Sequence, residues 1–255
     1  MEKYNFNAMK TRNILIAISA FAAALACSGA QKTEDLFNGK NLDGWKFFVE
    51  NGAAKPEDVF SVKNGMIHIK GVPFGFMYTE NKYSNFRLHV EWKYPIGGSN
   101  SGIFLFLQEP AKELWPNAVE CQLCSGKAGD FVLLGGSDVA EYKAPEGKPR
   151  PKFPVVERFE KDRENPVGEW NSADIVCRGG NIEVYINGTL QNVGTKSAHS
   201  SGYIGLQSEG GDILFRNVRL TPMDCRPDIR ILLPPAFGRF FLSPSAPKPA
   251  RISQC

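Results

Sequence analysis

The sequence lacks the short motifs that mark several large enzyme classes. GxGxxG, GxxxxGKS/T, GxSxG and HExxH are all absent. Their absence excludes a dinucleotide-binding fold, a P-loop NTPase, an α/β-hydrolase and a zincin-type protease. Runs with a helical period longer than two turns are absent too, so strands must supply most of the regular structure.

Cysteine is scarce in the part of the chain that we expect to fold. Three of the six cysteines lie near the chain ends, which leaves Cys121, Cys124 and Cys177. An odd number does not describe a disulfide framework. Cys121-x-x-Cys124 resembles half of a zinc site, but no second CxxC or HxxxH follows, and on a strand residues three apart point to opposite faces. We expect buried structural cysteines.

No apolar run is long enough to span a bilayer. The longest, from Ile14 to Ala26, has about 13 residues where roughly 20 are needed. It follows Lys10 and Arg12 and ends in small residues, which is typical of a secretory signal peptide over residues 1–26.

Cys27 follows this run directly. Ala24-Leu25-Ala26-Cys27 resembles the cleavage site of a bacterial lipoprotein. We therefore expect an exported protein of the periplasm or outer membrane, held to the membrane only through a lipid anchor on Cys27, with a short linker over 27–33. Plain secretion and a retained anchor are the alternatives.

The chain has no basic excess once its two ends are set aside. Residues 224–255 contain six prolines and no periodicity, which predicts a disordered tail, with a partner-binding extension as the alternative. The whole chain carries a net charge of +3, whereas residues 27–223 carry −2. A nucleic-acid partner is therefore not expected.

Between the ends, apolar and polar residues alternate in short runs, which is typical of half-buried strands. Asn64-Gly65 and Asn187-Gly188 predict hairpin turns. Residues 126–168 show little alternation, and we expect them to form a loop at the rim of a binding cleft. The expected strands are 60–62, 66–69, 86–92, 102–107, 119–123, 173–177, 182–186, 203–207 and 213–220.

Three of these strands carry polar side chains on one face. The rows are Arg87, His89 and Glu91, then Glu120 and Gln122, then Gln207 and Glu209. Together they predict a concave polar sheet suited to sugar hydroxyls, with a solvated outer face as the alternative. Trp115 and Trp170 flank these segments and could stack on a pyranose ring, unless they are buried in the core.

Several phrases in order resemble the 3-keto-disaccharide hydrolase family over residues 34–223. They are Asp35 to Trp45, Ser99 to Leu105, Trp115 to Gln122, Gly168 to Asn171, Val184 to Gly188 and Gly202 to Arg219. The resemblance implies an all-β fold, a concanavalin A-like jelly-roll β-sandwich of two antiparallel sheets with a concave polar face.

The resemblance also implies a substrate, a glycoside whose sugar is oxidised at C3. The ketone acidifies the C2 proton, so a base can form an enolate, the aglycone leaves from C1, and water adds later. Such an enzyme needs a base, an acid and an electrophile at the ketone oxygen, which a divalent metal ion could supply. A separate sugar 3-dehydrogenase would provide the substrate.

We expect Glu120 to act as the base or a metal ligand, with Glu91 or His89 as the second acid-base group. Glu120 and Glu209 are the candidate metal ligands. The candidates for substrate binding are Gln122, Asn100, Trp115, Gln207 and Glu209.

The sequence departs from the family at two places. The family often has Asp where Cys124 stands, within Glu120-Cys121-Gln122-Leu123-Cys124, and Arg where Phe106 stands. A polar residue is missing at each place, which bears on activity more than on fold. The alternatives are a non-catalytic carbohydrate-binding module or lectin of the same fold, and direct glycoside hydrolysis, although a Glu-x-Asp-x-x-Glu strand is absent.

Overall fold

The computed structural model describes residues 32–110, 112–161 and 163–224. The expected leader, the lipidation site at Cys27, most of the linker and all of the Pro-rich tail except residue 224 lie outside the described residues. Export, anchoring and tail disorder therefore stay predictions.

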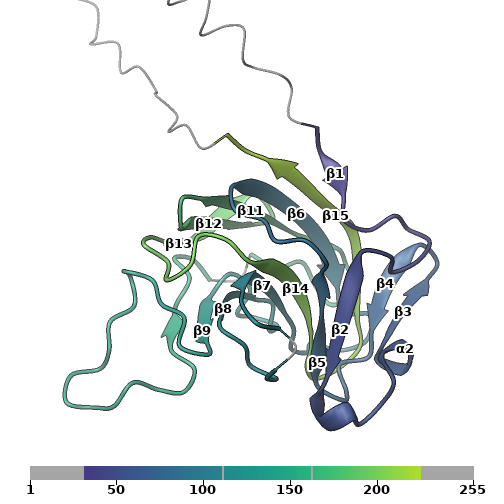
Figure 1. Cartoon of the computed structure of the whole chain (residues 1–255), viewed down its shortest axis with the longest axis horizontal. Coiled ribbons are helices and arrows are strands. Elements are labelled where there is room, and N and C mark those ends of the chain that lie inside the picture. The colour runs from purple at the N-terminus through teal and green to yellow at the C-terminus, as the bar shows by residue number, and fades with distance from the viewer. Residues whose placement is uncertain (1–31, 111, 162, 225–255) are drawn as a thin grey trace, which may run out of the picture. The chain divides into compact units, whose positions relative to one another are not determined.

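The described chain folds into two antiparallel sheets that pack face to face (Figure 1). The first sheet runs in the order β13 (Thr189–Gly194), β12 (Asn181–Ile186), β11 (Asn171–Arg178), β6 (Phe86–Lys93), β15 (Ile213–Pro222), β4 (Met66–Ile69) and β3 (Phe60–Lys63), with β1 (Glu34–Asp35) paired to β15. The second runs β10 (Val155–Val156), β9 (Phe131–Leu134), β8 (Ala118–Gln122), β7 (Gly102–Leu107), β14 (Tyr203–Ser208), β5 (Gly75–Thr79) and β2 (Trp45–Val49).

Helical structure in these residues is limited to a 3-10 turn, Glu50–Gly52, and the single turn α2 (Pro56–Val59). Neither is long and apolar enough to cross a membrane. The expectation of an all-β jelly-roll sandwich is thus confirmed.

The two expected hairpins form because their turn residues tolerate positive φ. Asn64 and Gly65 have φ of 51° and 74° between β3 and β4, and Asn187 and Gly188 have 48° and 78° between β12 and β13. Mirror-image turns of this kind match the twist of the strands they join.

The sequence pattern did not reveal β5 and β9 of the second sheet, because both faces of these strands are covered. All five residues of β5 and all four of β9 are buried. A strand of this kind shows no alternation of polar and apolar residues, although β7, buried at all six residues, was among the expected strands. The very short β1 and β10, together with β2 and β13, were also missed.

Two apolar clusters cover the two faces of the second sheet. The larger one lies between the sheets and includes Leu88, Trp92, Cys121 and Ile204. A smaller one lies on the opposite face of the second sheet and includes Phe76, Phe104, Val132 and Leu134. Packing on the inner face holds the second sheet in place, and its outer face carries the site described below.

Gly75 is required by close strand packing. A Cβ atom at this position would overlap the backbone carbonyl of Phe48 on the neighbouring β2. Backbone cannot move aside as a flexible side chain can, so any side chain here must disturb the pairing of β5 with β2.

We therefore expect Gly75→Ala to lower the free energy of unfolding by about 3 kcal/mol. Gly44→Ala serves for comparison, because its Cβ meets no atom within 4 Å and only the positive φ of 83° opposes it, at a cost of about 1 kcal/mol. Urea denaturation measures both. A Gly75→Ala protein as stable as Gly44→Ala would contradict the tight β2–β5 packing.

Candidate functional site

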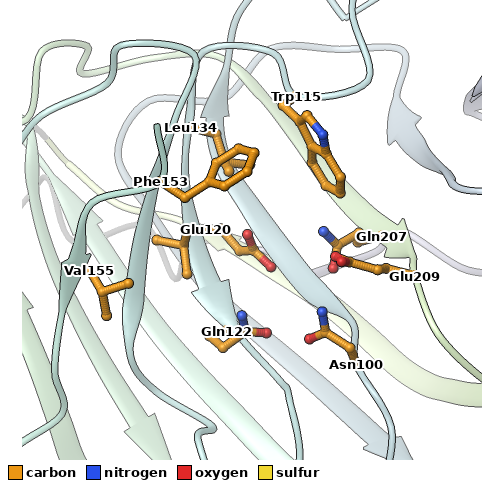
Figure 2. A pocket seen from close by; sticks show the side chains of 10 residues that line it. Asn100, Trp115, Glu120, Gln122, Leu134, Phe153, Val155, Gln207 and Glu209 are labelled. Atoms are coloured by element: carbon orange, nitrogen blue, oxygen red, sulfur yellow. The ribbon is translucent and has the colours of Figure 1, made fainter. Parts of the chain in front are cut away.

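A pocket of about 230 Å³ opens on the outer face of the second sheet. Its polar side chains point into a common space, with aromatic side chains beside them (Figure 2). The lining residues are Asn100, Trp115, Glu120, Gln122, Val132, Leu134, Phe153, Val155, Gln207 and Glu209. The structure thus brings together six of the eight candidate catalytic and substrate-binding residues.

Strand β8 places Glu120 in the pocket. Along this strand Val119 and Cys121 pack into the core between the sheets, so the alternate residues Glu120 and Gln122 face outward. Glu120 pairs with Phe104 of β7, and a Cβ atom on the adjacent Gly102 would overlap the Glu120 carboxyl group. Gly102 therefore leaves the space that this carboxyl group occupies.

Strand β14 supplies the opposite wall. Gln207 follows the core residue Leu206 and projects to the outer face, where it is 1% exposed. Ser101 donates a hydrogen bond of 2.8 Å to the backbone carbonyl of Gln207. Just beyond, Glu209 pairs with Asn100 in an isolated bridge. Residues that are about a hundred positions apart in the sequence therefore line one small pocket.

Four buried polar atoms in this pocket lack a hydrogen-bond partner. They are Glu120 Oε1, Asn100 Oδ1, and both Oε1 and Nε2 of Gln207. Buried polar groups in folded proteins are nearly always paired, because leaving one unpaired costs about 1–3 kcal/mol. A concentration of such atoms in one cavity indicates a site preorganised for the polar groups of a ligand.

Gln122 is held differently from these residues. Its Oε1 accepts hydrogen bonds of 2.9 Å from the backbone N–H groups of Leu123 and Cys124. Its oxygen is thereby occupied, and the side chain is fixed with its amide group at the pocket wall (Figure 2).

The pKa values of both carboxyl groups of the pocket are raised. Burial raises the pKa of Glu120 well above its usual range, and the nearby Glu209 adds to the shift. Burial also raises the pKa of Glu209, although the amide groups of Asn100 and Gln207 act in the opposite direction. Perturbed carboxyl groups in a pocket are typical of acid-base chemistry.

Aromatic side chains form the outer rim. The rings of Trp115 and Phe153 meet edge to face with centroids 5.6 Å apart, and the centroid of the Phe74 ring lies 6.4 Å from that of Trp115. Phe153 comes from the long segment between β9 and β10, where a rim loop was expected. The sequence pattern did not single out Phe153, because no periodicity marks a residue in an irregular loop.

Glu91 and His89 do not reach this pocket. They lie on β6 of the first sheet, on the face opposite to the core residues Leu88 and Val90. The structure therefore corrects the expectation that one of them works beside Glu120. The error arose because alternation shows which residues share a face of a strand, but not in which sheet the strand lies.

Both residues instead belong to a saturated polar network. His89 Nδ1 lies 3.0 Å from Asp174, while Glu91 accepts hydrogen bonds from Arg216 Nε at 2.6 Å and Asn217 Nδ2 at 2.7 Å. These partners lower the pKa of Glu91 against the opposing effect of burial. Every group in this network has a partner, which is typical of a structural role.

Trp170 belongs to this network and not to the pocket. The Arg216 guanidinium lies 3.9 Å from the centre of its ring and Lys93 Nζ lies 4.9 Å from it. Of the two tryptophans considered for sugar stacking, only Trp115 lines the site.

The departures from the family pattern do not fall on the pocket lining. Phe106 is buried in the core between the sheets, and so is Cys121. Cys124 is half-buried beyond the end of β8 and is not part of the lining. These departures leave the polar groups around Glu120 in place.

The pocket contains oxygen donors suited to a hard cation. Within the residues that the structure describes, no three His, Cys, Asp or Glu side chains are grouped to hold a metal ion. Glu120 and Glu209 nevertheless lie beside the unpaired amide oxygens of Asn100 and Gln207. An all-oxygen set of this kind fits Mg²⁺, Ca²⁺ or Mn²⁺ better than zinc.

Comparisons with known proteins agree with this architecture. Two crystal structures of putative glycosyl hydrolases from Parabacteroides distasonis are similar to the chain. One has a TM-score of 0.55 at 24% identity, covering 75% of this chain and 94% of that one. The other has a TM-score of 0.54 at 23% identity, covering 75% and 100%. At this identity the likeness shows the fold alone.

A curated relative, the 3-keto-disaccharide hydrolase of Bacteroides thetaiotaomicron, is 24% identical over 231 residues, which cover 74% of this chain and 78% of the relative. The family described as the 3-keto-alpha-glucoside-1,2-lyase-like domain matches residues 32–221. This match spans both sheets and every pocket residue, so the chain belongs to the 3-keto-alpha-glucoside-1,2-lyase-like family, the 3-keto-disaccharide hydrolases.

Proposed function

We propose that this protein cleaves the glycosidic bond of 3-keto-glycosides, including 3-keto-disaccharides, by elimination followed by hydration. The observation that carries the proposal is the buried carboxyl group of Glu120, which has a raised pKa and an unpaired oxygen among unpaired amide groups. The family and the name of the curated relative support the substrate class.

The chemistry begins at the C2 proton of the oxidised ring. Glu120 in its ionised form takes this proton, and the C–H electron pair moves toward the ketone to give an enolate. A carboxylate with a raised pKa is a stronger base than an ordinary glutamate, which suits a carbon acid. The low exposure of Glu120, at 2%, keeps water from competing for it.

The negative charge that develops on the ketone oxygen needs a donor. Gln207 Nε2 is buried in the wall of the pocket and can donate a hydrogen bond to this oxygen. A divalent cation held by Glu209 and the amide oxygens of Asn100 and Gln207 would polarise the same oxygen as a Lewis acid.

The aglycone then leaves from C1 as the enolate collapses, and its oxygen needs a proton. Glu120 holds the C2 proton at this point and can return it to the leaving oxygen, so it takes the role of acid that we first sought in Glu91 or His89. Glu209 lies beside it as the negative charge that adds to its raised pKa. Water next adds across the C1–C2 double bond, with hydroxide at C1 and a proton at C2, giving a free 3-keto-sugar.

The ketone must exist before the protein acts. No group in this proposal removes hydride from C3, so a separate sugar 3-dehydrogenase supplies the substrate. Trp115 and Phe153 at the rim offer aromatic surface for the bound sugar or its aglycone.

Glu120→Gln is expected to reduce aglycone release from a 4-nitrophenyl 3-keto-glucoside by about 100-fold or more, because the base is lost. Glu91→Gln is the matched control, since Glu91 lies on the other sheet, and should keep near wild-type turnover if it remains folded by circular dichroism. A fully active Glu120→Gln protein would reject Glu120 as the base. Turnover of the unoxidised glucoside would favour direct hydrolysis, and binding without any turnover would favour a sugar-binding module.

The pH profile of kcat/KM tests the coupling of the two carboxyl groups. Because the base must be ionised and its pKa is raised, activity should rise with pH through a range above that of an ordinary glutamate. Glu209→Gln removes a neighbouring negative charge, so the acidic limb should move to lower pH. An unmoved limb would show that these two residues do not interact.

Metal binding predicts a shift in thermal stability. Mg²⁺, Mn²⁺ or Ca²⁺ should raise the Tm of the wild-type protein, because a ligand that binds only the folded state stabilises it. The shift should vanish in Glu209→Gln and persist in Glu91→Gln. Treatment with EDTA should lower turnover until the cation is returned. Turnover that is unaffected by EDTA and by added cations would exclude a metal role.

A further inference from the structure

A second cavity opens directly beside the site. It has a volume of about 440 Å³ and shares the side chains of Gln122, Val132 and Val155 with the pocket that contains Glu120. The two cavities therefore adjoin along these three side chains.

Cationic side chains predominate in this second cavity. Lys127, Arg158 and Lys161 line it together with the acids Asp130 and Glu157. Asp130 is already neutralised, because its Oδ1 lies 3.0 Å from Arg158 NH1 and both side chains are largely buried. Among the described residues Lys127 and Lys161 make no ion pair, and the side chains that line the cavity carry three positive and two negative charges. Glu164, an acid beside the same turn, has one carboxylate oxygen held by two backbone N–H groups.

The backbone that carries Lys127 is well anchored. The N–H of Lys127 donates to the Cys124 carbonyl at 2.7 Å, and Glu164 Oε1 accepts from the N–H groups of Gly126 and Ala128 at 2.9 and 3.0 Å. The Gly126 carbonyl also accepts a hydrogen bond from Arg158. The turn is thus fixed to the segment that contains Lys161, and both lysines are presented to the same cavity.

The opposite side of the site has a different character. There a cavity lined by Trp115, Phe153 and the Gly135-Gly136 pair carries one acid, Glu113, and one base, Lys152. Lys152 Nζ lies 5.1 Å from the centre of the Phe153 ring. One side of the site is therefore aromatic with balanced charge, and the other side is cationic.

We propose that the cavity beside Gln122 is a subsite that selects aglycones carrying an anionic group, a carboxylate or a sulfate, through Lys127 and Lys161. The assignment to the aglycone rests on the proposed function, because the oxidised ring must occupy the pocket at Glu120 and only the rest of the substrate can reach beyond Gln122. Attraction of an anion to this cavity does not depend on catalysis.

The test compares two ligands of nearly equal shape and different charge, 4-carboxyphenyl glucoside and 4-carbamoylphenyl glucoside, each as both anomers. NMR titration with the full chain measures binding of these unoxidised compounds. The wild-type protein should bind the carboxylate about fivefold more tightly at low ionic strength. This preference should shrink at about 0.5 M salt, because exposed charges are screened.

Lys127→Gln/Lys161→Gln should abolish the preference and leave affinity for the neutral amide unchanged. Lys63→Gln/Lys70→Gln is the matched control, since it removes the same charge from the β3–β4 region of the other sheet, and it should retain the preference. Equal affinity for the two ligands, no detectable affinity for either, or a preference that survives in Lys127→Gln/Lys161→Gln would each overturn the inference.

Turnover of the corresponding 3-keto-glucosides separates this inference from the proposed function. A carboxylate preference in binding without turnover of either 3-keto compound would reject the proposed function and keep an anion-selective cavity. Turnover of both compounds with equal affinity would keep the function and reject the anionic subsite.

Discussion

The burial of one carboxyl group on the outer face of a sheet is the constraint on which the site depends. Glu120 lies over Gly102 of the neighbouring strand, in a space that any other residue at position 102 would fill. Burial without a compensating partner raises its pKa and leaves Oε1 unpaired. The cost of this arrangement must be met by packing elsewhere, chiefly by the apolar core between the two sheets.

The second sheet can carry this cost because it is apolar on both faces. Its inner face contributes Ile103, Val119 and Leu206 to the main core, and Phe76 and Phe104 form a second cluster on the outer face. The floor of the pocket is therefore lined by buried apolar side chains where Glu120 and Gln207 project. A sheet with one solvated face would have surrounded the same carboxyl group with water and given it an ordinary pKa.

Polar residues serve two different purposes on the two sheets, and pairing distinguishes them. On the first sheet His89 is paired with Asp174 and Glu91 with Arg216, which stabilises the outer surface. On the second sheet Glu120 and Gln207 are buried and unsatisfied. A row of polar side chains on a strand indicates either case equally well, so unpaired donors and acceptors are the better guide to a binding site.

The sequence by itself determined the strand pattern, the Asn-Gly hairpins and the family phrases, because these depend on local periodicity, on residues that tolerate positive φ, and on order along the chain. It also identified Glu120, Gln122, Gln207 and Glu209 as outward-facing, since alternation along one strand is a local property. Only the tertiary structure decided that β8 and β14 flank β7 in one sheet while β6 belongs to the other. This arrangement places Glu209 near Glu120 and places Glu91 on the other sheet. It depends on strand pairing between segments far apart in the sequence, about which a local pattern carries no information.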